Sequence, residues 1–209
     1  MNVHGWQIPK KGALFVVTGA SGSGKTTLVK KALSTIPSIE FSVSATTRPI
    51  RHNEKDGVDY HFLSNEQFQS KIQEGAFLEW AEVYGNYYGT LKQPVEEALQ
   101  KGLSILLDID IKGAQQVKEN APTCTSIFIL PPNFDTLESR LRARNTDTEQ
   151  TIQKRMAESK IQLRGCIHFD HLVMNDNLAC AHDCFQGILL TELSKSKYRM
   201  DWIEHFTNV

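Results

Sequence analysis

Eight consecutive residues near the start of the chain have the types and spacing of a phosphate-binding loop. They read Gly19-Ala-Ser-Gly-Ser-Gly-Lys-Thr26 and fit the pattern G-x-x-x-x-G-K-[ST] in full. Glycines allow backbone N–H groups to close around an anion without Cβ clashes, and the N-terminus of a following helix adds partial positive charge. An apolar run precedes the motif and a helical pattern follows it, which argues against a turn that merely ends a strand.

The motif also assigns individual tasks. In such a loop the ammonium of the lysine, here Lys25, reaches the β- and γ-phosphates of ATP, and the hydroxyl of Thr26 is a ligand of the Mg²⁺ that accompanies ATP. We therefore expect nine residues to surround the ATP phosphates: Gly19, Ala20, Ser21, Gly22, Ser23, Gly24, Lys25, Thr26 and Thr27.

Two carboxylates follow the apolar run Leu103–Leu107, at Asp108 and Asp110. Residues i and i+2 share one face of a strand, so both carboxylates can project to the same side at its end. In open α/β sheets, ligands bind at the carboxyl ends of the strands. One carboxylate at this edge suits the water shell of Mg²⁺, and the other is free for a substrate. A solvated acidic turn is the alternative, which the nearby phosphate loop disfavours.

Short apolar runs without polar alternation predict buried parallel strands. They are Ala13–Thr18, Leu103–Leu107, Ser126–Leu130 and His171–Met174. Helical patterns occupy the intervals and the end of the chain: Thr26–Leu33, Pro94–Leu99, Leu137–Ala143, Thr151–Leu163, and a helix from Ala179 into the 190s. Thr146 and Glu149 have the spacing of a capping box for the fourth of these helices.

Strands that alternate with helices predict an α/β fold, a parallel sheet covered by helices on both faces. The interval from Ser42 to Tyr88 does not fit this alternation. It is rich in Thr, Arg, Asn, Asp and Gly, and it indicates short strands and turns. Polar insertions of this length in compact folds are usually functional, so we expect a core of P-loop NTPase type with a guest subdomain.

Composition excludes some classes of protein. A formal net charge of −1 gives no electrostatic case for a nucleic-acid or membrane partner. The N-terminus lacks the apolar stretch of a signal peptide, and the first strongly apolar run, Ala13–Val17, is too short to span a bilayer. The four cysteines form no CxxC pair, and Cys166, His168 and His171 lack a fourth ligand at a usual spacing. We expect free, reduced thiols and a cytoplasmic protein.

The insertion resembles the GMP-binding region of guanylate kinases. Ser42–Arg51 reads S-V-S-A-T-T-R-P-I-R and is similar to that family's S-V-S-x-T-T-R-x-x-R. Further segments look like signatures of the family, in the family's order: Asp56–Phe62, Phe77–Ala81, Gly85–Thr90, Asp108–Gly113, Ile127–Pro132 and Val173–Asp176. The likeness extends from about Ala13 to Asp176. It implies transfer of the γ-phosphate of ATP to GMP, with dGMP left open as a second acceptor.

The resemblance implies three parts and a set of GMP contacts. The parts are a core of residues 11–42, 98–132 and 156–209, a small mixed α+β GMP-binding insertion of residues 43–97, and a helical lid of residues 133–155. By the resemblance, the GMP phosphate is held by Arg48, Arg51, Tyr60 and Tyr88. Glu79 would accept the adjacent N1–H and N2–H₂ of guanine, and the pocket is completed by Ser44, Gly89, Thr90 and Asp110.

The segments after the insertion resemble the family's lid, whose arginines act on the transferring phosphoryl group. The resemblance assigns this task to Arg144 and Arg155, which join Lys25 and Arg48 as the expected catalytic residues. It places Arg140 and Asn175 beside adenine. A plain cationic helix face is the alternative for these arginines.

Four positions depart from the family pattern, and two other functions compete. Ala20, Thr26 and Thr90 keep the small size or hydroxyl that each role requires, whereas Asn145 replaces the usual Gly after the lid arginine. A non-enzymatic binding module is disfavoured by the intact phosphate loop. A P-loop kinase acting on a different phosphate ester is disfavoured by Glu79. The sequence leaves the oligomeric state open.

Overall fold

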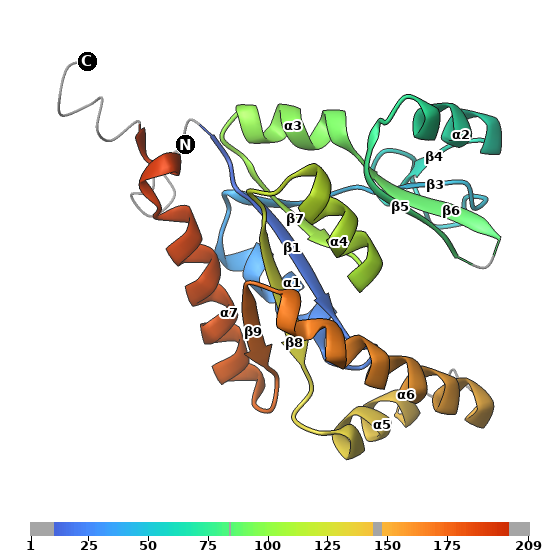
Figure 1. Ribbon diagram of the computed structural model, residues 1–209, viewed down its shortest axis with the longest axis vertical. Helices are drawn as coiled ribbons and strands as arrows, with labels where there is room; N and C mark the ends of the chain where they lie inside the picture. The colour runs from blue at the N-terminus through green and yellow to red at the C-terminus, as the bar shows by residue number, and fades with distance from the viewer. Residues whose placement is uncertain (1–10, 84, 144–147, 201–209) are drawn as a thin grey trace.

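The computed structural model describes residues 11–83, 85–143 and 148–200. These residues form two sheets, and a pair of helices projects from the larger one (Figure 1). Figure 1 places the smaller sheet and the projecting helix pair at opposite ends of the same side of the molecule. The larger sheet between them carries the phosphate-loop motif at the end of one of its strands.

The core sheet has five strands, all parallel, in the order β2-β7-β1-β8-β9. Their bounds are β1 Leu14–Gly19, β2 Ile39–Phe41, β7 Ser104–Asp108, β8 Thr125–Leu130 and β9 His171–Met174. The four predicted strands are therefore present, and the α/β class is confirmed. Edge strand β2 was not predicted, because it has only three residues and two of them are exposed.

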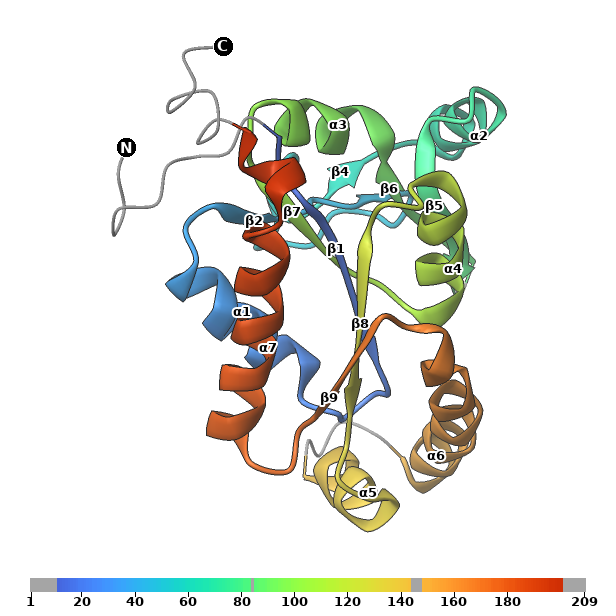
Figure 2. The ribbon, with the colours of Figure 1, turned by 60° about the vertical axis from the view of Figure 1, so that its left-hand side comes forward.

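Helices cover both faces of this sheet, as the strand–helix alternation predicts (Figure 2). On one face lie α1, Lys25–Thr35, and α7, Leu178–Leu193. On the other lie α3, Lys92–Gln100, and α4, Ile111–Asn120. Helix α4 was missed, because its apolar residues are few and Gly113 interrupts its pattern. Its sheet-facing residues are nevertheless buried, Ala114 and Val117 among them.

The smaller sheet has four strands in the order β4-β3-β6-β5. Their bounds are β3 Ala45–Thr46, β4 His61–Phe62, β5 Phe77–Val83 and β6 Asn86–Leu91. The predicted short strands are confirmed, but the interval also contains helix α2, Asn65–Gln73, which was not expected. Ser64 and Gln67 form a complete capping box at its start, and Phe68 buries the helix against the sheet beside Phe77.

The projecting pair consists of α5, Phe134–Arg142, and α6, Glu149–Arg164. Helix α6 begins two residues earlier than predicted, because the side chain of Thr148 caps it by accepting a hydrogen bond from the N–H of Thr151. The expected capping residue, Thr146, lies outside the described residues. Two short 3₁₀ turns, η1 Gly165–His168 and η2 Ser196–Tyr198, follow α6 and α7. In the described ranges no helix combines the length and apolar character needed to cross a membrane.

Helix α7 belongs to the core, although the sequence after Ala179 carries no diagnostic motif. Its residue Phe185 is fully buried with Phe15, Ile127 and Leu28 of the sheet and α1. We predict that Phe185→Ala lowers the free energy of unfolding by about 3–5 kcal/mol, measured by urea denaturation, because the cavity it leaves cannot fully collapse. Cys184→Ala, at the exposed neighbouring position, is the control and should change it by less than about 0.5 kcal/mol. A small loss at Phe185 would contradict this packing.

Candidate functional site

The phosphate loop connects β1 to α1 and has the backbone shape that its glycines predict. Gly22 and Gly24 adopt φ values of 91° and 87°, a left-handed region that side chains disfavour. Gly24 immediately precedes α1, and no side chain caps the helix. The N–H of Thr27 donates to the carbonyl of Gly24 at 3.1 Å, and the N–H groups before it can face an anion, to whose attraction the helix dipole adds.

The loop forms one wall of a cavity of about 410 Å³. The opposite wall is the end of β7 and the start of α4, residues 108–111, and α6 contributes Gln162. The ammonium of Lys25 lies against the carboxylate of Asp108 across this cavity. The motif residues and both predicted carboxylates thus come together, whereas Gln162 was missed because nothing in the sequence pattern of α6 distinguishes it.

Asp108 and Asp110 do not share a strand, contrary to the sequence-based expectation. Strand β7 ends at Asp108, and Asp110 caps α4 by accepting a hydrogen bond from the N–H of Gly113 at 2.8 Å. The backbone therefore turns between the two carboxylates. Asp108 stays with the phosphate loop, while Asp110 turns toward the second sheet, where Glu79 lies.

Arg140 and Asn175 lie against the phosphate loop. The side-chain amide of Asn175 is buried and donates to the carbonyl of Ser23 at 2.7 Å, and Arg140 approaches the same carbonyl at 3.4 Å. Arg140 also donates to the carbonyl of Asn175 at 3.1 Å. These bonds hold the Ser23 carbonyl in place within the phosphate loop. Leu137 of α5 packs behind Gly22.

Glu79 is placed by an irregularity in β5. The register of β5 against β6 shifts between Phe77 and Glu79, where Leu78 is the extra residue, and Phe77 and Leu78 are buried in different clusters. Such bulges re-aim side chains. Glu79 is buried, with 7% of the residue exposed. Its carboxylate accepts a hydrogen bond from the hydroxyl of Thr90 at 2.7 Å.

Helix α4 holds the backbone on both sides of Glu79. The amide of Gln116 pairs with Trp80, accepting from its N–H at 3.1 Å and donating to its carbonyl at 3.0 Å. Asn120 donates to the carbonyl of Leu78 at 2.9 Å. These two amides take the place of a further strand along the edge of β5. Sequence reasoning missed both, because an amide on a helix has no motif.

The buried position of Glu79 disfavours the ionised form of its carboxyl group. Burial raises the pKa of this carboxyl above its usual range, the hydrogen bond from Thr90 acts in the opposite direction, and the carboxylate of Asp110 adds to the rise. Gly113 leaves the room for this arrangement, since a Cβ there would lie 3.0 Å from an oxygen of Glu79. A carboxylate held in an unfavourable place is ready to accept hydrogen bonds from a ligand.

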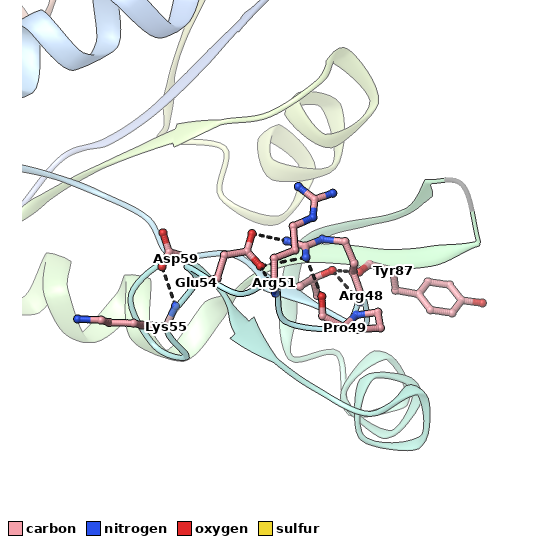
Figure 3. Close-up of polar contacts among 8 residues, drawn as sticks. Arg48, Pro49, Arg51, Glu54, Lys55, Asp59 and Tyr87 are labelled. Atoms are coloured by element: carbon pink, nitrogen blue, oxygen red, sulfur yellow. Dashed lines mark hydrogen bonds and ion pairs between the residues drawn. The ribbon is translucent and has the colours of Figure 1, made fainter. Parts of the chain in front are cut away.

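Arg48 is the centre of the polar contacts in the second subdomain (Figure 3). Its guanidinium forms a two-pronged ion pair with Glu54, at 3.0 and 2.7 Å. The ring of Tyr60 lies 5.4 Å from the guanidinium, and the rings of Tyr60 and Tyr88 meet edge to face at 6.1 Å. Three of the four residues predicted for the GMP phosphate are therefore neighbours. Arg51 is exposed, and in Figure 3 its guanidinium extends away from the carboxylate of Glu54.

The remaining predicted residues divide between the two sheets. Ser44 precedes β3, and Gly89 and Thr90 lie buried on β6. Arg155 lies half-buried on α6 and is not among the residues that line the phosphate cavity. Arg144 and Asn145 lie outside the described residues. Arg142 forms ion pairs with Glu138 and Glu149, which joins α5 to α6.

A phosphate loop at the carboxyl edge of a parallel sheet, with helices on both faces, defines a P-loop NTPase fold. The family model described as guanylate kinase matches residues 11–191. A guanylate kinase of Carboxydothermus hydrogenoformans is 47% identical over 187 residues, 90% of this chain and 92% of the relative. One of Syntrophotalea carbinolica is 46% identical over 183 residues, 88% of this chain and 87% of the relative.

A solved structure agrees with these relatives. The crystal structure of guanylate kinase from Anaplasma phagocytophilum superposes with a TM-score of 0.70 at 30% identity, covering 95% of this chain and 96% of the other. The chain belongs to the guanylate kinase family. Members of this family are kinases that phosphorylate GMP. The family predicted from the sequence motifs is confirmed.

The bond from Asn175 to the Ser23 carbonyl yields a prediction. Asn175→Ala should lower the free energy of unfolding by about 1–3 kcal/mol and raise KM for ATP more than KM for GMP, because a buried carbonyl of the phosphate loop loses its best donor. Binding of inorganic tripolyphosphate should weaken as well, since the loop itself is disturbed. Asn65→Ala, on exposed α2, is the control. An unchanged tripolyphosphate affinity would contradict the effect on the loop.

The raised pKa of Glu79 leads to a prediction about stability. Because the folded protein holds a proton on Glu79 more tightly than the unfolded chain does, the ionised carboxylate destabilises the fold above the unfolded pKa. Glu79→Gln should therefore raise the free energy of unfolding at pH 7–8. The difference from wild type should shrink as the pH falls through the folded pKa, measured by urea unfolding across pH. Glu82→Gln, exposed on the same strand, should show no such trend.

Proposed function

We propose that the chain transfers the γ-phosphate of ATP to GMP by in-line attack of a GMP phosphate oxygen, in the ATP and GMP sites described above. The observation that carries the proposal is the buried, destabilised carboxylate of Glu79, which lies between the two sheets beside Asp110. The attacking oxygen is already anionic, so that little proton transfer is required. The protein's contribution is to position two anions and to neutralise their charge.

The donor side is the phosphate loop. Its N–H groups and the helix terminus of α1 would cradle the β- and γ-phosphates, and Lys25 would move from Asp108 onto them, because a phosphate is the more highly charged partner. Asp108 and the hydroxyl of Thr26 line the same cavity.

These two oxygen donors fit Mg²⁺. The ion prefers hard oxygen ligands and keeps several waters or phosphate oxygens of its own, so a hydroxyl and one carboxylate suffice. In the described ranges no three Cys, His, Asp or Glu side chains gather to hold a metal ion without a nucleotide. We propose that Thr26 binds Mg²⁺ directly and Asp108 through water. When bound with ATP, Mg²⁺ neutralises charge that develops on the transferring group.

The acceptor side is the second subdomain. Arg48 and Arg51 would bind the GMP phosphate by charge, and Tyr60 and Tyr88 through their hydroxyl groups. Glu79 would accept N1–H and N2–H₂ of guanine together, while Thr90 keeps the carboxylate in place. Adenine offers no such pair of donors and would leave the carboxylate buried without a partner, which is strongly disfavoured. Ser44, Gly89 and Asp110 would complete this pocket.

Closure would bring the parts together. We propose that the insertion of residues 43–97 and the outer part of the lid, residues 133–155, approach each other over the two nucleotides. Arg144 and Arg155 would then reach the transferring phosphoryl group, and water would be excluded. Arg140 and Asn175, which contact the phosphate loop from outside it, would lie beside the adenine of ATP.

The test is an ADP-release assay with ATP and Mg²⁺ that compares GMP, dGMP, AMP, UMP and CMP. We predict turnover with GMP and at most weak turnover with AMP, UMP and CMP. Glu79→Gln should lower kcat/KM for GMP by about 10²- to 10⁴-fold, since the buried acceptor of both guanine donors loses its charge and one acceptor position.

Glu82→Gln serves as the matched control and should leave kcat/KM within about twofold. Turnover with another monophosphate would retain the phosphate-transfer chemistry and overturn the role of Glu79. A folded protein that phosphorylates none of the five nucleotides would favour the non-enzymatic binding module instead.

A further inference from the structure

Glu54 contacts both arginines that the proposed function assigns to the GMP phosphate. Its two carboxylate oxygens accept from the guanidinium of Arg48, and one of them also accepts from the backbone N–H of Arg51 at 2.9 Å (Figure 3). The ion pair is well covered, with side-chain exposures of 12% for Arg48 and 18% for Glu54. No motif of the sequence assigns a task to Glu54.

The hydrogen atoms of Arg48 can be counted. A guanidinium has five N–H groups. Nη1 donates to Glu54 at 3.0 Å and to the carbonyl of Pro49 at 2.7 Å, and Nη2 donates to Glu54 at 2.7 Å. The Nε–H and the second Nη2–H, which lie parallel on one edge, make no bond to Glu54 or Pro49. Tyr88 interacts with the same guanidinium. A fork of two parallel N–H groups matches two phosphate oxygens.

We propose that Glu54 is a positioning residue for GMP, which turns the side edge of Arg48 and the backbone of Arg51 toward the phosphate. The inference rests on the proposed function. Glu54 does not itself touch GMP. It fixes an arginine whose flexible side chain would otherwise lose rotamer freedom each time GMP binds.

An alternative is that Glu54 competes with GMP for Arg48 and must be displaced. The count of hydrogen atoms argues against this, because the carboxylate and a phosphate would use different edges of the guanidinium. The bond to the backbone of Arg51 also argues against it, since displacement would free the turn that carries the second arginine. With both arginines ionised, one carboxylate leaves a net charge of +1 to attract the phosphate.

The experiment compares Glu54→Gln with wild type for three ligands. KM for GMP should rise about 10-fold or more, because hydrogen bonds to a charged partner are worth roughly 1.5–3 kcal/mol. KM for ATP and the inhibition constant of guanosine, which lacks the phosphate, should change by less than about twofold. Glu66→Gln, at an exposed carboxylate of the insertion that also accepts a side-chain hydrogen bond, is the control and should change none of the three.

A double-mutant cycle with Arg48→Lys tests the route of the effect. If Glu54 acts through Arg48, the loss in the double variant should be smaller than the sum of the two single losses. A lower KM for GMP in Glu54→Gln would overturn the proposal in favour of competition. An equal weakening of guanosine and GMP would also overturn it, since the effect would then be on the fold of the insertion.

Failure of the proposed function and failure of this inference give different results. If wild type phosphorylates no GMP, the proposed function fails, and this inference fails with it. If wild type is active but Glu54→Gln does not fold by circular dichroism, Glu54→Asp is measured in the same way. That variant keeps the charge with a shorter reach, and we expect a rise in KM for GMP of at least about threefold with guanosine unchanged. A wild-type KM for this variant would overturn the proposal.

Discussion

The structure depends on the contact between one helix, α4, and the backbone of one strand, β5. Gln116 and Asn120 hydrogen-bond to the strand on both sides of Glu79, in place of a neighbouring strand. The free edge of a strand normally bonds to solvent or to a second chain. The free edge of β5 is instead bonded to α4, a helix that packs on the core sheet. The second subdomain is therefore attached to the core on both sides of Glu79, the residue that we propose reads the base.

The same helix sets the separation of the two proposed nucleotide sites. Asp108 ends β7 beside Lys25, and two residues later Asp110 caps α4 next to Glu79. Residues 108–110 thus connect the ion-pair partner of Lys25 to the proposed base pocket. A displacement of α4 along the sheet would move Asp110 and Glu79 together, relative to a loop that is held separately by the bond from Asn175. The separation of the two proposed sites therefore depends on a three-residue covalent link and on the side-chain contacts between α4 and β5.

The sequence predicted most of this arrangement, and its failures have physical causes. The phosphate loop and the four long strands could be predicted, since each depends on a local pattern of glycines or apolar residues. Helices α2 and α4 could not be predicted. Helix α2 has few apolar positions, and the pattern of α4 is interrupted by Gly113, where a Cβ would crowd the carboxylate of Glu79. The two-residue spacing of Asp108 and Asp110 suggested a shared strand, but the strand ends between them. The parts played by Gln116 and Glu54 arise from tertiary contacts, which leave no periodic trace.

A kinase for two anions must concentrate cations without destabilising itself in their absence. The described residues meet this requirement by giving key cations a carboxylate partner: Asp108 beside Lys25, and Glu54 beside Arg48. The two pairs differ in one respect that follows from side-chain shape. We propose that Lys25, whose ammonium is a compact and mobile charge, turns from Asp108 toward a phosphate, which makes the carboxylate available to Mg²⁺. A guanidinium has two usable edges, so Arg48 can hold Glu54 and a phosphate at once. The choice of lysine on the donor side and arginine on the acceptor side therefore matches an exchange of partners at one site and a permanent scaffold at the other.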